Sequence, residues 1–447
     1  MPRQLFGTDG IRGVAGEYPL DPSTVHAVGA ALGEWARHHS GAVVLGTDTR
    51  ESGPWIAGTL AAGLAASQVD VHFAGVITTP GVAWLTRRGP FSAGVMISAS
   101  HNPYQDNGIK IFDHSGYKLP DEEEHALEEE IFRLRNESGE PPRLPLAVEE
   151  NLDARYLNYL ASTLDVTLDG LHLVVDCGHG AASCLAPPLL RRLGARVDAV
   201  GCSPDGRNIN SGCGALHLDL LCRMVTERGA DAGVAFDGDA DRAMFVSRSG
   251  RVVDGDGMML LCARHLLAAG KLSGNGAGPV VVATVMSNLG LEKALERQGI
   301  RMLRTGVGDK YVLEEMRRCG ATLGGEQSGH VIFHEYATTG DGLLTALRVF
   351  EVMRQSGRGL DELTADLDVY PQRLLNVRVR HKKPLEELPS VQREIRAAEQ
   401  TLAGNGRILV RFSGTEPLAR VMVEGLDLAT VDYLAERIAA ALRAELA

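Results

Sequence analysis

Cysteine pairs, leader-like segments and long apolar runs are the features that this chain most clearly lacks. Its seven cysteines include no C-x-x-C pair, and an odd number cannot all pair with one another. A disulfide framework or a zinc site is therefore not expected, and a reducing compartment is the simpler interpretation. Residues 1–6 contain no apolar leader segment, and no run reaches the ~18 apolar residues that cross a membrane. We expect a cytoplasmic protein without a membrane partner.

Clusters of lysine and arginine are also missing. The formal net charge is -12, from 45 basic and 57 acidic residues. Nucleic-acid-binding proteins usually have a basic face, so no nucleic-acid partner is expected. An anionic small substrate remains compatible with this charge, because screening over ~8 Å at physiological salt leaves binding to a few local arginines.

Three motifs of nucleotide-binding and hydrolytic enzymes are absent as well. The chain has no G-x-x-x-x-G-K-[ST] phosphate loop, no G-x-G-x-x-G that opens a helix after the first strand, and no G-x-S-x-G nucleophile elbow. Nucleotide-driven transfer, dinucleotide redox chemistry and α/β-hydrolase chemistry therefore lose support.

What the sequence does contain is an alternation of short apolar runs with amphipathic stretches. The apolar runs are residues 42–45, 93–97, 171–175, 233–236 and 280–283. Strands this apolar, separated by helices, indicate parallel or mixed sheets covered on both faces. One helix is predicted to begin at Pro22, after the cap residue Asp21.

Three breaks divide the chain, near residues 140–145, 254–259 and 367–371. The last part changes in pattern, with strands near 374–379, 408–412 and 420–423 and helices at about 389–402 and 428–446. At ~150 residues per domain, a chain of 447 residues has room for three or four domains. We predict three similar α/β domains, at 1–150, 151–256 and 257–368, and a smaller C-terminal α+β domain at 369–447.

A serine-rich turn, residues 98–103 (SASHNP), directly follows the apolar run that ends at Ile97. In open α/β sheets ligands bind at the carboxyl ends of strands, so a hydroxyl in this turn is well placed for chemistry. Lys110 follows Ser100 ten positions later. A polar turn that merely closes a strand is the competing interpretation, and the more frequent one for this motif alone.

Three aspartates alternate with small residues in segment 237–242 (DGDADR), directly after another apolar run. Like charges this close repel one another unless a cation neutralises them. Oxygen ligands alone favour Mg²⁺ or a related hard cation over zinc or copper. A calcium EF-hand does not fit, because Arg242 and Arg248 occupy its glycine and glutamate positions. The pattern predicts a metal loop formed by Asp237, Asp239 and Asp241 rather than a solvated acidic turn.

Three further motifs are weaker when each is taken alone. A glycine-bracketed turn at 8–13 presents Arg12. Residues 324–330 (GGEQSGH) combine a carboxylate, a hydroxyl and an imidazole, which suit sugar hydroxyls or an amine. Residues 411–417 (RFSGTEP) combine a guanidinium, hydroxyls and backbone N–H groups, which suit a phosphate dianion. In isolation, a solvated arginine is the more frequent explanation of the first motif, and a polar turn or a hairpin explains the other two about equally well.

Taken in order, these motifs resemble those of the α-D-phosphohexomutase superfamily over the whole chain. The resemblance rests on residues 5–13, 98–110, 237–242, 324–330 and 411–417, with further matches at 204–206, 208–210, 284–288 and 307–311. Val307 and Gln327 differ from residues common in phosphomannomutases and phosphoglucomutases, and both favour the glucosamine branch. Ala240 stands where a glycine is expected inside the metal loop. The resemblance implies a central cleft between the four domains.

The resemblance also implies an activity. We expect an isomerase that interconverts glucosamine 6-phosphate and glucosamine 1-phosphate, through a phosphoserine at Ser100 and a 1,6-bisphosphate intermediate. Such an enzyme feeds UDP-N-acetylglucosamine and cell-wall precursor synthesis. One Mg²⁺ per chain is expected on Asp237, Asp239, Asp241 and an oxygen of the phosphoserine at Ser100. Glucosamine or glucose 1,6-bisphosphate is the expected activator, and a hexosamine phosphate the expected binding partner.

The remaining site residues follow from the matched motifs. The cationic residues expected around the transferred group are Arg12, Lys110, Arg242 and Arg411. The candidates for proton transfer, which the sequence does not rank, are Lys110, His101 and His330. The residues expected to hold the sugar and the phosphate that is not reacting are Thr305, Gly306, Glu326, Ser328, Arg411, Ser413 and Thr415.

Other functions share part of this pattern. A phosphoglucomutase or phosphomannomutase is the nearest alternative, and a serine-dependent phosphatase is another. From a different class, an inactive sugar-phosphate-binding regulator would retain the binding loops, although here all the reactive positions are filled. A homodimer and an activating kinase are left open as partners.

Overall fold

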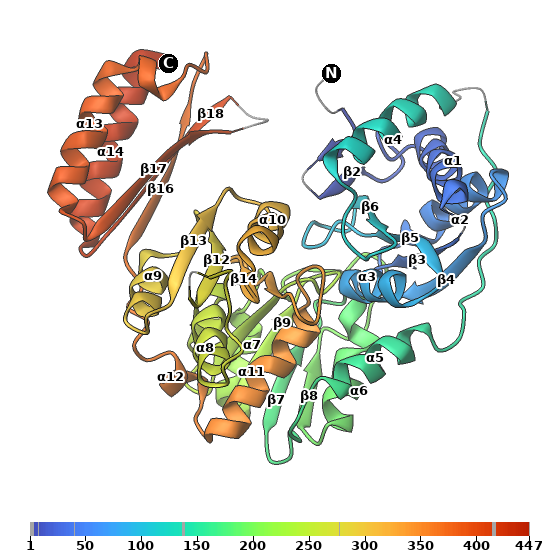
Figure 1. Cartoon of the computed structure of the whole chain (residues 1–447), viewed down its shortest axis with the longest axis horizontal. Helices are drawn as coiled ribbons and strands as arrows, with labels where there is room; N and C mark the ends of the chain where they lie inside the picture. The colour runs from blue at the N-terminus through green and yellow to red at the C-terminus, as the bar shows by residue number, and fades with distance from the viewer. Residues whose placement is uncertain are drawn as a thin grey trace. The chain divides into compact units, whose positions relative to one another are not determined.

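The computed structural model describes residues 4–7, 9–39, 41–135, 139–276, 278–413 and 417–446. The chain forms two compact units, and most of their helices and strands are labelled in Figure 1. The first unit contains residues 1–286 and 300–365, and the second contains residues 287–299 and 366–447. No helix in the described part of the chain is both long and apolar enough to cross a membrane.

The first α/β domain of the first unit has a mixed six-stranded sheet. In spatial order its strands are β1 (Phe6–Gly7), β2 (Gly10–Val14), β6 (Asp106–Asp113), β5 (Phe91–Ile97), β3 (Ala42–Thr47) and β4 (Val71–Val76). β3 is parallel to β4 and β5, whereas β6 is antiparallel to β5 and β2. Every residue of β5 is buried, and burying one valine or isoleucine contributes roughly 1.5–3 kcal/mol. The apolar run predicted at 93–97 is therefore a core strand.

Four helices belong to this domain: α1 (Pro22–His38), α2 (Gly53–Ala66), α3 (Thr79–Arg88) and α4 (Asp121–Leu134). Helix α1 begins as predicted, because the Asp21 side chain accepts the backbone N–H of Thr24 and Pro22 occupies the first turn. Thr78 caps α3 in the same way, through the N–H of Gly81. This cap matters for the site, because Thr79 in the first turn of α3 contacts the metal loop described below.

The second α/β domain is built on a five-stranded sheet. In spatial order its strands are β11 (Val252–Val253), β10 (Ala243–Ser247), β9 (Ala232–Phe236), β7 (His172–Asp176) and β8 (Arg196–Val200). β7 is parallel to β8 and β9, and β10 is antiparallel to β9. Its helices are α5 (Leu152–Ser162), α6 (Ala186–Arg192) and α7 (Asp219–Arg228), with a short 3-10 turn, η1 (Ala181–Cys184).

The third α/β domain has a four-stranded sheet. Its order is β13 (Arg301–Thr305), β12 (Val280–Thr284), β14 (Leu323–Gly325) and β15 (Val331–Phe333), accompanied by α8 (Gly255–Ala268), α10 (Asp309–Cys319), α11 (Gly342–Ser356) and α12 (Leu360–Leu363). The break expected near 254–259 coincides with the start of α8. The glycines there are helical because Asp254 caps the helix through the N–H groups of Asp256 and Gly257, which composition alone does not reveal.

The second unit is a smaller α+β fold, as predicted. Its antiparallel sheet has the order β16 (Gln372–Arg378), β18 (Leu418–Gly425) and β17 (Gly406–Phe412), with helices α13 (Pro389–Leu402) and α14 (Leu428–Leu446), the short helix α9 (Leu289–Glu296) and the turn η2 (Leu385–Glu387). Val391, Val421 and Ile438 are fully buried between sheet and helices. The predicted fold class is confirmed: three α/β domains with mixed sheets are followed by a smaller α+β domain.

Candidate active site

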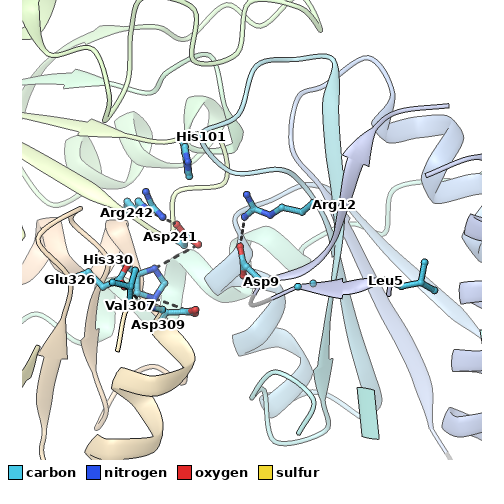
Figure 2. A pocket seen from close by; sticks show the side chains of 13 residues that line it. Leu5, Asp9, Arg12, His101, Asp241, Arg242, Val307, Asp309, Glu326 and His330 are labelled. Atoms are coloured by element: carbon cyan, nitrogen blue, oxygen red, sulfur yellow. Dashed lines mark hydrogen bonds and ion pairs between the residues drawn. The ribbon is translucent and has the colours of Figure 1, made fainter. Parts of the chain in front are cut away.

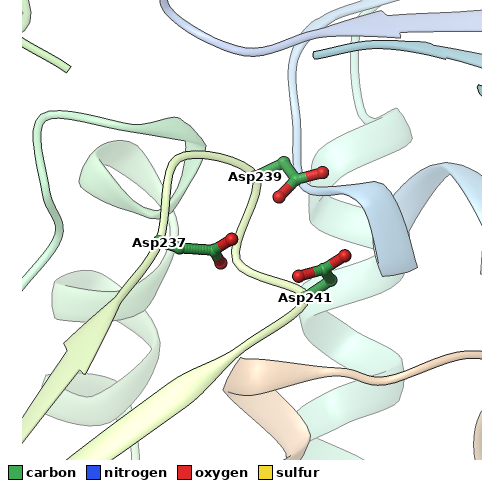
Figure 3. A group of neighbouring side chains, drawn as sticks. All are labelled: Asp237, Asp239 and Asp241. Carbon is green, nitrogen blue, oxygen red and sulfur yellow. The ribbon is translucent and has the colours of Figure 1, made fainter. Parts of the chain in front are cut away.

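The three aspartates of the predicted metal loop lie together in the turn that follows β9. Asp237, Asp239 and Asp241 are buried, and each offers a carboxylate oxygen within 4.8 Å of the others. Figure 3 shows the three side chains projecting from one loop toward one another. Burial and the charges of Asp241 and Asp239 raise the pKa of Asp237 well above its ordinary value. Such a cluster is electrostatically unfavourable without a cation.

The donor set fits a hard divalent cation. Among the residues that the structure describes, neither Asp239 Oδ1 nor Asp241 Oδ1 has a hydrogen-bond partner, although both atoms are buried. A buried carboxylate oxygen without a partner is costly unless an ion binds it. The available ligand atoms are all oxygens, which Mg²⁺ prefers. The residues of this loop are therefore able to hold the predicted ion.

Ser100 lies against this loop. Its side chain is buried in the turn after β5, and its hydroxyl donates a hydrogen bond to Asp237 Oδ2. The backbone of Ser100 has φ of +53°, a left-handed conformation that costs an L-residue roughly 1–2 kcal/mol. Ala240 in the metal loop has φ of +54°, which explains why a glycine is expected at that position. Both loops are therefore held in specific, unfavourable backbone conformations.

Lys110 is the cation closest to the aspartates. It lies on β6, is buried, and its ammonium donates to Asp239 at 2.8 Å and Asp241 at 3.3 Å. It also forms an ion pair with Asp9 at 3.1 Å. Burial lowers the pKa of Lys110, but the three carboxylates raise it by more, so that it lies well above its ordinary value. Lys110 therefore stays protonated beside the metal loop.

A second group of charges extends from Lys110 and was not predicted. Asp9 pairs with Arg12 and Lys118, and Lys118 also pairs with Asp309 at 2.6 Å. Burial raises the pKa of Asp9, but Lys110, Lys118 and Arg12 hold it well below its ordinary value. Asp9 and Asp309 fall inside segments that matched the superfamily, so a closer reading of those segments identifies them. Nothing near Lys118 in the sequence points to its role.

Asp9 and Arg12 line a cavity of about 400 Å³, together with Asp241 of the metal loop. The lining does not include Ser100 or Lys110. Figure 2 shows Arg12 and Asp9 on one side of the cavity, facing Arg242 and Asp241. The other lining residues are Leu5, Gly7, Gly10, His101, Val307, Gly308, Asp309, Glu326 and His330. A neighbouring cavity of about 470 Å³ shares Arg242, Val307 and Glu326 and is also lined by Ser328. Together they offer a space lined by acidic, basic and apolar side chains.

The carboxylate of Glu326 is held by two hydrogen bonds, one from its own loop and one from the segment after β13. One of its carboxylate oxygens accepts the backbone N–H of Gly308 at 3.2 Å, and the other accepts the hydroxyl of Ser328 at 3.2 Å. Thr305 ends β13, and Gly306 immediately precedes Val307, which lines both cavities. The carboxylate is thus oriented at the wall shared by the two cavities.

The two candidate histidines differ in their surroundings. His101 Nδ1 lies 3.4 Å from the Ser100 hydroxyl, and burial together with Arg242 and Arg12 lowers the pKa of His101 to about 4. The ring of His330 is buried, and its Nε2 accepts the backbone N–H of Gly340 at 2.9 Å. Its Nδ1 lies 3.7 Å from Asp241. His101 therefore lies beside the Ser100 hydroxyl, whereas His330 is held as a neighbour of the metal loop.

The predicted phosphate loop belongs to the second unit. Arg411 lies on β17 directly opposite Arg420 on β18, and burial followed by the charge of Arg420 lowers the pKa of Arg411. Ser413 follows β17, and its carbonyl oxygen accepts the ammonium of Lys382 at 2.6 Å. Thr415 lies outside the described residues. Two arginines thus lie opposite each other on neighbouring strands beside this loop.

The sequence did not predict four residues that lie next to the Ser100 turn or the metal loop. Thr79 contacts the metal loop twice, through its hydroxyl to Asp239 Oδ2 and its backbone N–H to Asp239 O at 3.0 Å. Asp48, Arg50 and Asn210 contact the turn that contains Ser100 and are described below. Asp48 and Arg50 follow the buried strand β3, so the rule that located Ser100 after β5 also points to them.

Comparison with known proteins adds independent information. Models of the four phosphoglucomutase/phosphomannomutase domains match residues 3–138 (domain I), 154–250 (domain II), 254–370 (domain III) and 374–441 (C-terminal domain). The chain is similar to a phosphoglucosamine mutase of Solibacter usitatus, with 62% identity over 100% of both chains. A phosphoglucosamine mutase of Koribacter versatilis is 52% identical over 99% of this chain and 97% of its own.

Solved structures agree on the fold. A phosphoglucomutase/phosphomannomutase family protein from Burkholderia thailandensis superposes with a TM-score of 0.80 at 25% identity, over 98% of this chain and 97% of its own. An Aspergillus fumigatus N-acetylphosphoglucosamine mutase, solved with GlcNAc-6P and magnesium, has a TM-score of 0.68 at 20% identity, over 99% and 96% of the two chains.

Proposed function

The chain belongs to the phosphoglucomutase/phosphomannomutase family, and on that premise we propose that it interconverts glucosamine 6-phosphate and glucosamine 1-phosphate. The central observation is the contact between the Ser100 hydroxyl and Asp237, which joins a candidate phosphoryl carrier to a metal-binding loop. The choice of glucosamine is supported by the full-length relatives named phosphoglucosamine mutase.

Ser100 is the proposed phosphoryl carrier. In the first step the bond between phosphorus and Ser100 Oγ breaks, and a bond forms to the free hydroxyl of the hexosamine phosphate. The sugar hydroxyl loses its proton and Oγ gains one, so a 1,6-bisphosphate and a free serine result. After the bisphosphate turns around, its other phosphoryl group returns to Ser100, which leaves the isomeric monophosphate.

The metal loop is the proposed site of one Mg²⁺. Asp237, Asp239 and Asp241, with an oxygen of the phosphoserine, would hold the ion, as the unpartnered oxygens of Asp239 and Asp241 suggest. When bound, Mg²⁺ offsets negative charge on the transferred group. Lys110, Arg12 and Arg242 add fixed positive charge around the same space, and electrostatic positioning of this kind accounts for most of the catalysis of phosphoryl transfer.

Contacts suggest how protons move. His101 Nδ1 lies near Ser100 Oγ, so we assign to it the exchange of the serine proton. Lys110 donates to two carboxylates of the metal loop and stays protonated, so its role is to hold positive charge beside the transferred group. His330 accepts a backbone N–H at Nε2, so its role is to orient Asp241.

The remaining predicted residues bind the substrate in this proposal. Glu326 and Ser328 contact the sugar, next to the backbone of Thr305 and Gly306. Arg411, Ser413 and Thr415 hold the phosphate that is not reacting. Each of the four domains, which we place at 1–150, 151–256, 257–368 and 369–447, thus supplies one loop for phosphoserine, metal, sugar or phosphate.

Three further assignments complete the proposal. Glucosamine or glucose 1,6-bisphosphate restores Ser100 phosphorylation when the intermediate is lost. The protein acts in the cytoplasm, an assignment supported by its seven free cysteines. The proposed protein partners are a second copy of this chain, in a homodimer, and an activating kinase.

A coupled assay tests this function directly. Purified protein is supplied with Mg²⁺, a trace of glucose 1,6-bisphosphate and, in turn, the 6-phosphates of glucosamine, glucose and mannose. We expect the highest kcat/KM for glucosamine 6-phosphate. Preference for glucose or mannose would assign the chain to another branch of the family. Steady release of inorganic phosphate would indicate a phosphatase, and no turnover of any sugar would indicate a regulator.

A further inference from the structure

Arg50 is a buried arginine whose hydrogen bonds converge on the turn that contains Ser100. It follows β3, and its side chain is 1% exposed. A guanidinium has five N–H donors. One of them, on Nε, donates to Asp48 Oδ2 at 2.9 Å. The other four reach the carbonyl oxygens of Ser100 and Asn102 at 2.9 Å each, of Asp106 at 3.0 Å, and of Pro103.

Asp48 holds the other side of the same turn. The hydroxyl of Ser98 donates to Asp48 Oδ2 at 2.6 Å, and in turn accepts the backbone N–H of Ser100 at 2.9 Å. Asp48 Oδ1 also accepts the backbone N–H of Arg50 at 3.0 Å. The N–H and the C=O of Ser100 are therefore both bound, directly or through Ser98, to one buried ion pair.

A residue from the second α/β domain completes the arrangement. Asn210 donates its side-chain amide to Ser100 O at 2.9 Å and to Asn102 O at 3.2 Å, the same two oxygens that Arg50 binds. The metal loop also approaches this carbonyl closely, because a Cβ added to Gly238 would lie 2.5 Å from Ser100 O. The backbone of Ser100 is thus fixed at the point where the phosphoserine turn meets the metal loop.

We propose that Asp48, Arg50 and Asn210 form a loop clamp, in which Arg50 is the positioning residue that holds Ser100 Oγ against the metal loop. The inference rests on the proposed function. Ser100 adopts a left-handed φ of +53°, and without external bonds the turn would relax toward a more favourable backbone conformation. Such a relaxation moves Oγ away from Asp237. None of the clamp residues lines either described cavity, so we assign them a positioning role through the turn that contains Ser100.

A purely structural role for Arg50 predicts a different result. A buried arginine elsewhere in the unit provides the comparison. Arg348 on α11 donates to Glu351 at 2.7 Å and to a backbone carbonyl, far in sequence from the phosphoserine turn. If Arg50 only supports the fold, Arg50→Lys and Arg348→Lys will lower stability and activity alike. If Arg50 positions Ser100, only Arg50→Lys will slow phosphoryl transfer in protein that is still folded.

The test measures transfer in a single turnover. Wild type, Arg50→Lys, Asn210→Ala, Ser98→Ala and Arg348→Lys are phosphorylated with glucose 1,6-bisphosphate, separated from it, and mixed with glucosamine 6-phosphate. Lysine keeps the charge but loses the planar fork. We expect transfer to slow about 100-fold in Arg50→Lys, the size of effect expected from a misplacement of about 1 Å. Substrate KM and the unfolding temperature should change no more than in Arg348→Lys.

The outcomes separate the two hypotheses. Slow transfer in Arg50→Lys, with Asn210→Ala and Ser98→Ala slowed to a lesser degree, supports the clamp. If Arg50→Lys does not fold, the two milder variants decide, because each removes one small group. Transfer at the wild-type rate in the folded variants overturns the clamp and leaves the proposed function intact. Absence of transfer in the wild type overturns the proposed function, and the clamp with it.

Discussion

The hydroxyl of Ser100 donates a hydrogen bond to Oδ2 of Asp237, a residue 137 positions away in the chain. This contact places the candidate phosphoryl carrier beside three buried carboxylates. A phosphoryl group on Ser100 would add negative charge next to these three carboxylates, which already repel one another. The arrangement is therefore stable only with a bound cation and with Lys110 protonated. The first two predictions follow from this contact.

Replacing Ser100 with alanine should abolish mutase activity without unfolding the protein. The substitution removes only a hydroxyl, and the left-handed φ costs alanine about as much as serine. Intact mass of the wild type should show a fraction with one added phosphate, which peptide mapping places at Ser100. Full activity of Ser100→Ala, or phosphate mapped to another residue, would disprove the carrier role.

Removing the metal or one of its ligands should be far more damaging than changing an aspartate elsewhere. EDTA should abolish activity, and Mg²⁺ should restore it. Asp239→Asn should reduce kcat by at least 100-fold, because removing one electrostatic contact to the transition state typically costs 10²–10³. Calorimetry should show that this variant binds Mg²⁺ more weakly.

Asp21→Asn is the matched control for the metal prediction. Asp21 caps α1 through the N–H of Thr24, and asparagine is an equally good cap, so stability should change by ~1 kcal/mol or less. Activity and Mg²⁺ affinity should stay at the wild-type level. An enzyme that tolerates both EDTA and Asp239→Asn would show that the three aspartates form only an acidic turn.

Glu326→Gln should reduce the use of glucosamine 6-phosphate more than the use of glucose 6-phosphate. The ammonium of glucosamine gives the carboxylate a charge-assisted partner worth roughly 1.5–3 kcal/mol, which glucose lacks. About half of that survives in a site open to solvent, so selectivity should fall roughly tenfold. The measurement is kcat/KM on both sugars, with the exposed Glu436 of α14 changed to glutamine as a control. An equal loss on both sugars would assign Glu326 to the sugar hydroxyls.

Asp341 should make stability depend on pH between about 4 and 6. Burial raises the pKa of Asp341 to about 6, whereas an unfolded aspartate titrates near ~3.9. Between these two values the folded protein holds a proton on Asp341 that the unfolded chain has released. The stabilisation from this proton is full below pH ~4 and is lost as the pH rises through about 6. A shift of this size corresponds to on the order of 3 kcal/mol.

Asp341→Asn isolates that effect. Asparagine keeps the cap on the N–H of Leu344 and a partner for the hydroxyl of Tyr156, both of which Asp341 binds. Urea unfolding of the variant and the wild type, compared from pH 4 to 7, should show the variant gaining stability relative to the wild type as pH rises. Parallel curves would mean that Asp341 titrates like an exposed aspartate.

The sequence by itself determined the fold class, the main strands and the segments that contain the candidate site residues. Buried strands such as β5 and β9 appear as short apolar runs, and the polar segments that follow them contain Ser100 and Asp237. Strand identity and loop chemistry are local properties, set within a few residues, so they can be predicted without coordinates.

Tertiary structure alone decided which of these groups meet. Lys118 forms ion pairs with Asp9 and Asp309, which lie far from it in the chain. Arg50 and Asn210, also far from Ser100 in the chain, donate hydrogen bonds to its carbonyl oxygen. Such pairs depend on strand order and on how neighbouring domains pack, which no local pattern encodes. The same is true of Ala240. The sequence alone shows that the side chain at this position is small. The φ of +54° at Ala240 shows that a left-handed backbone conformation is the reason why a glycine is expected there.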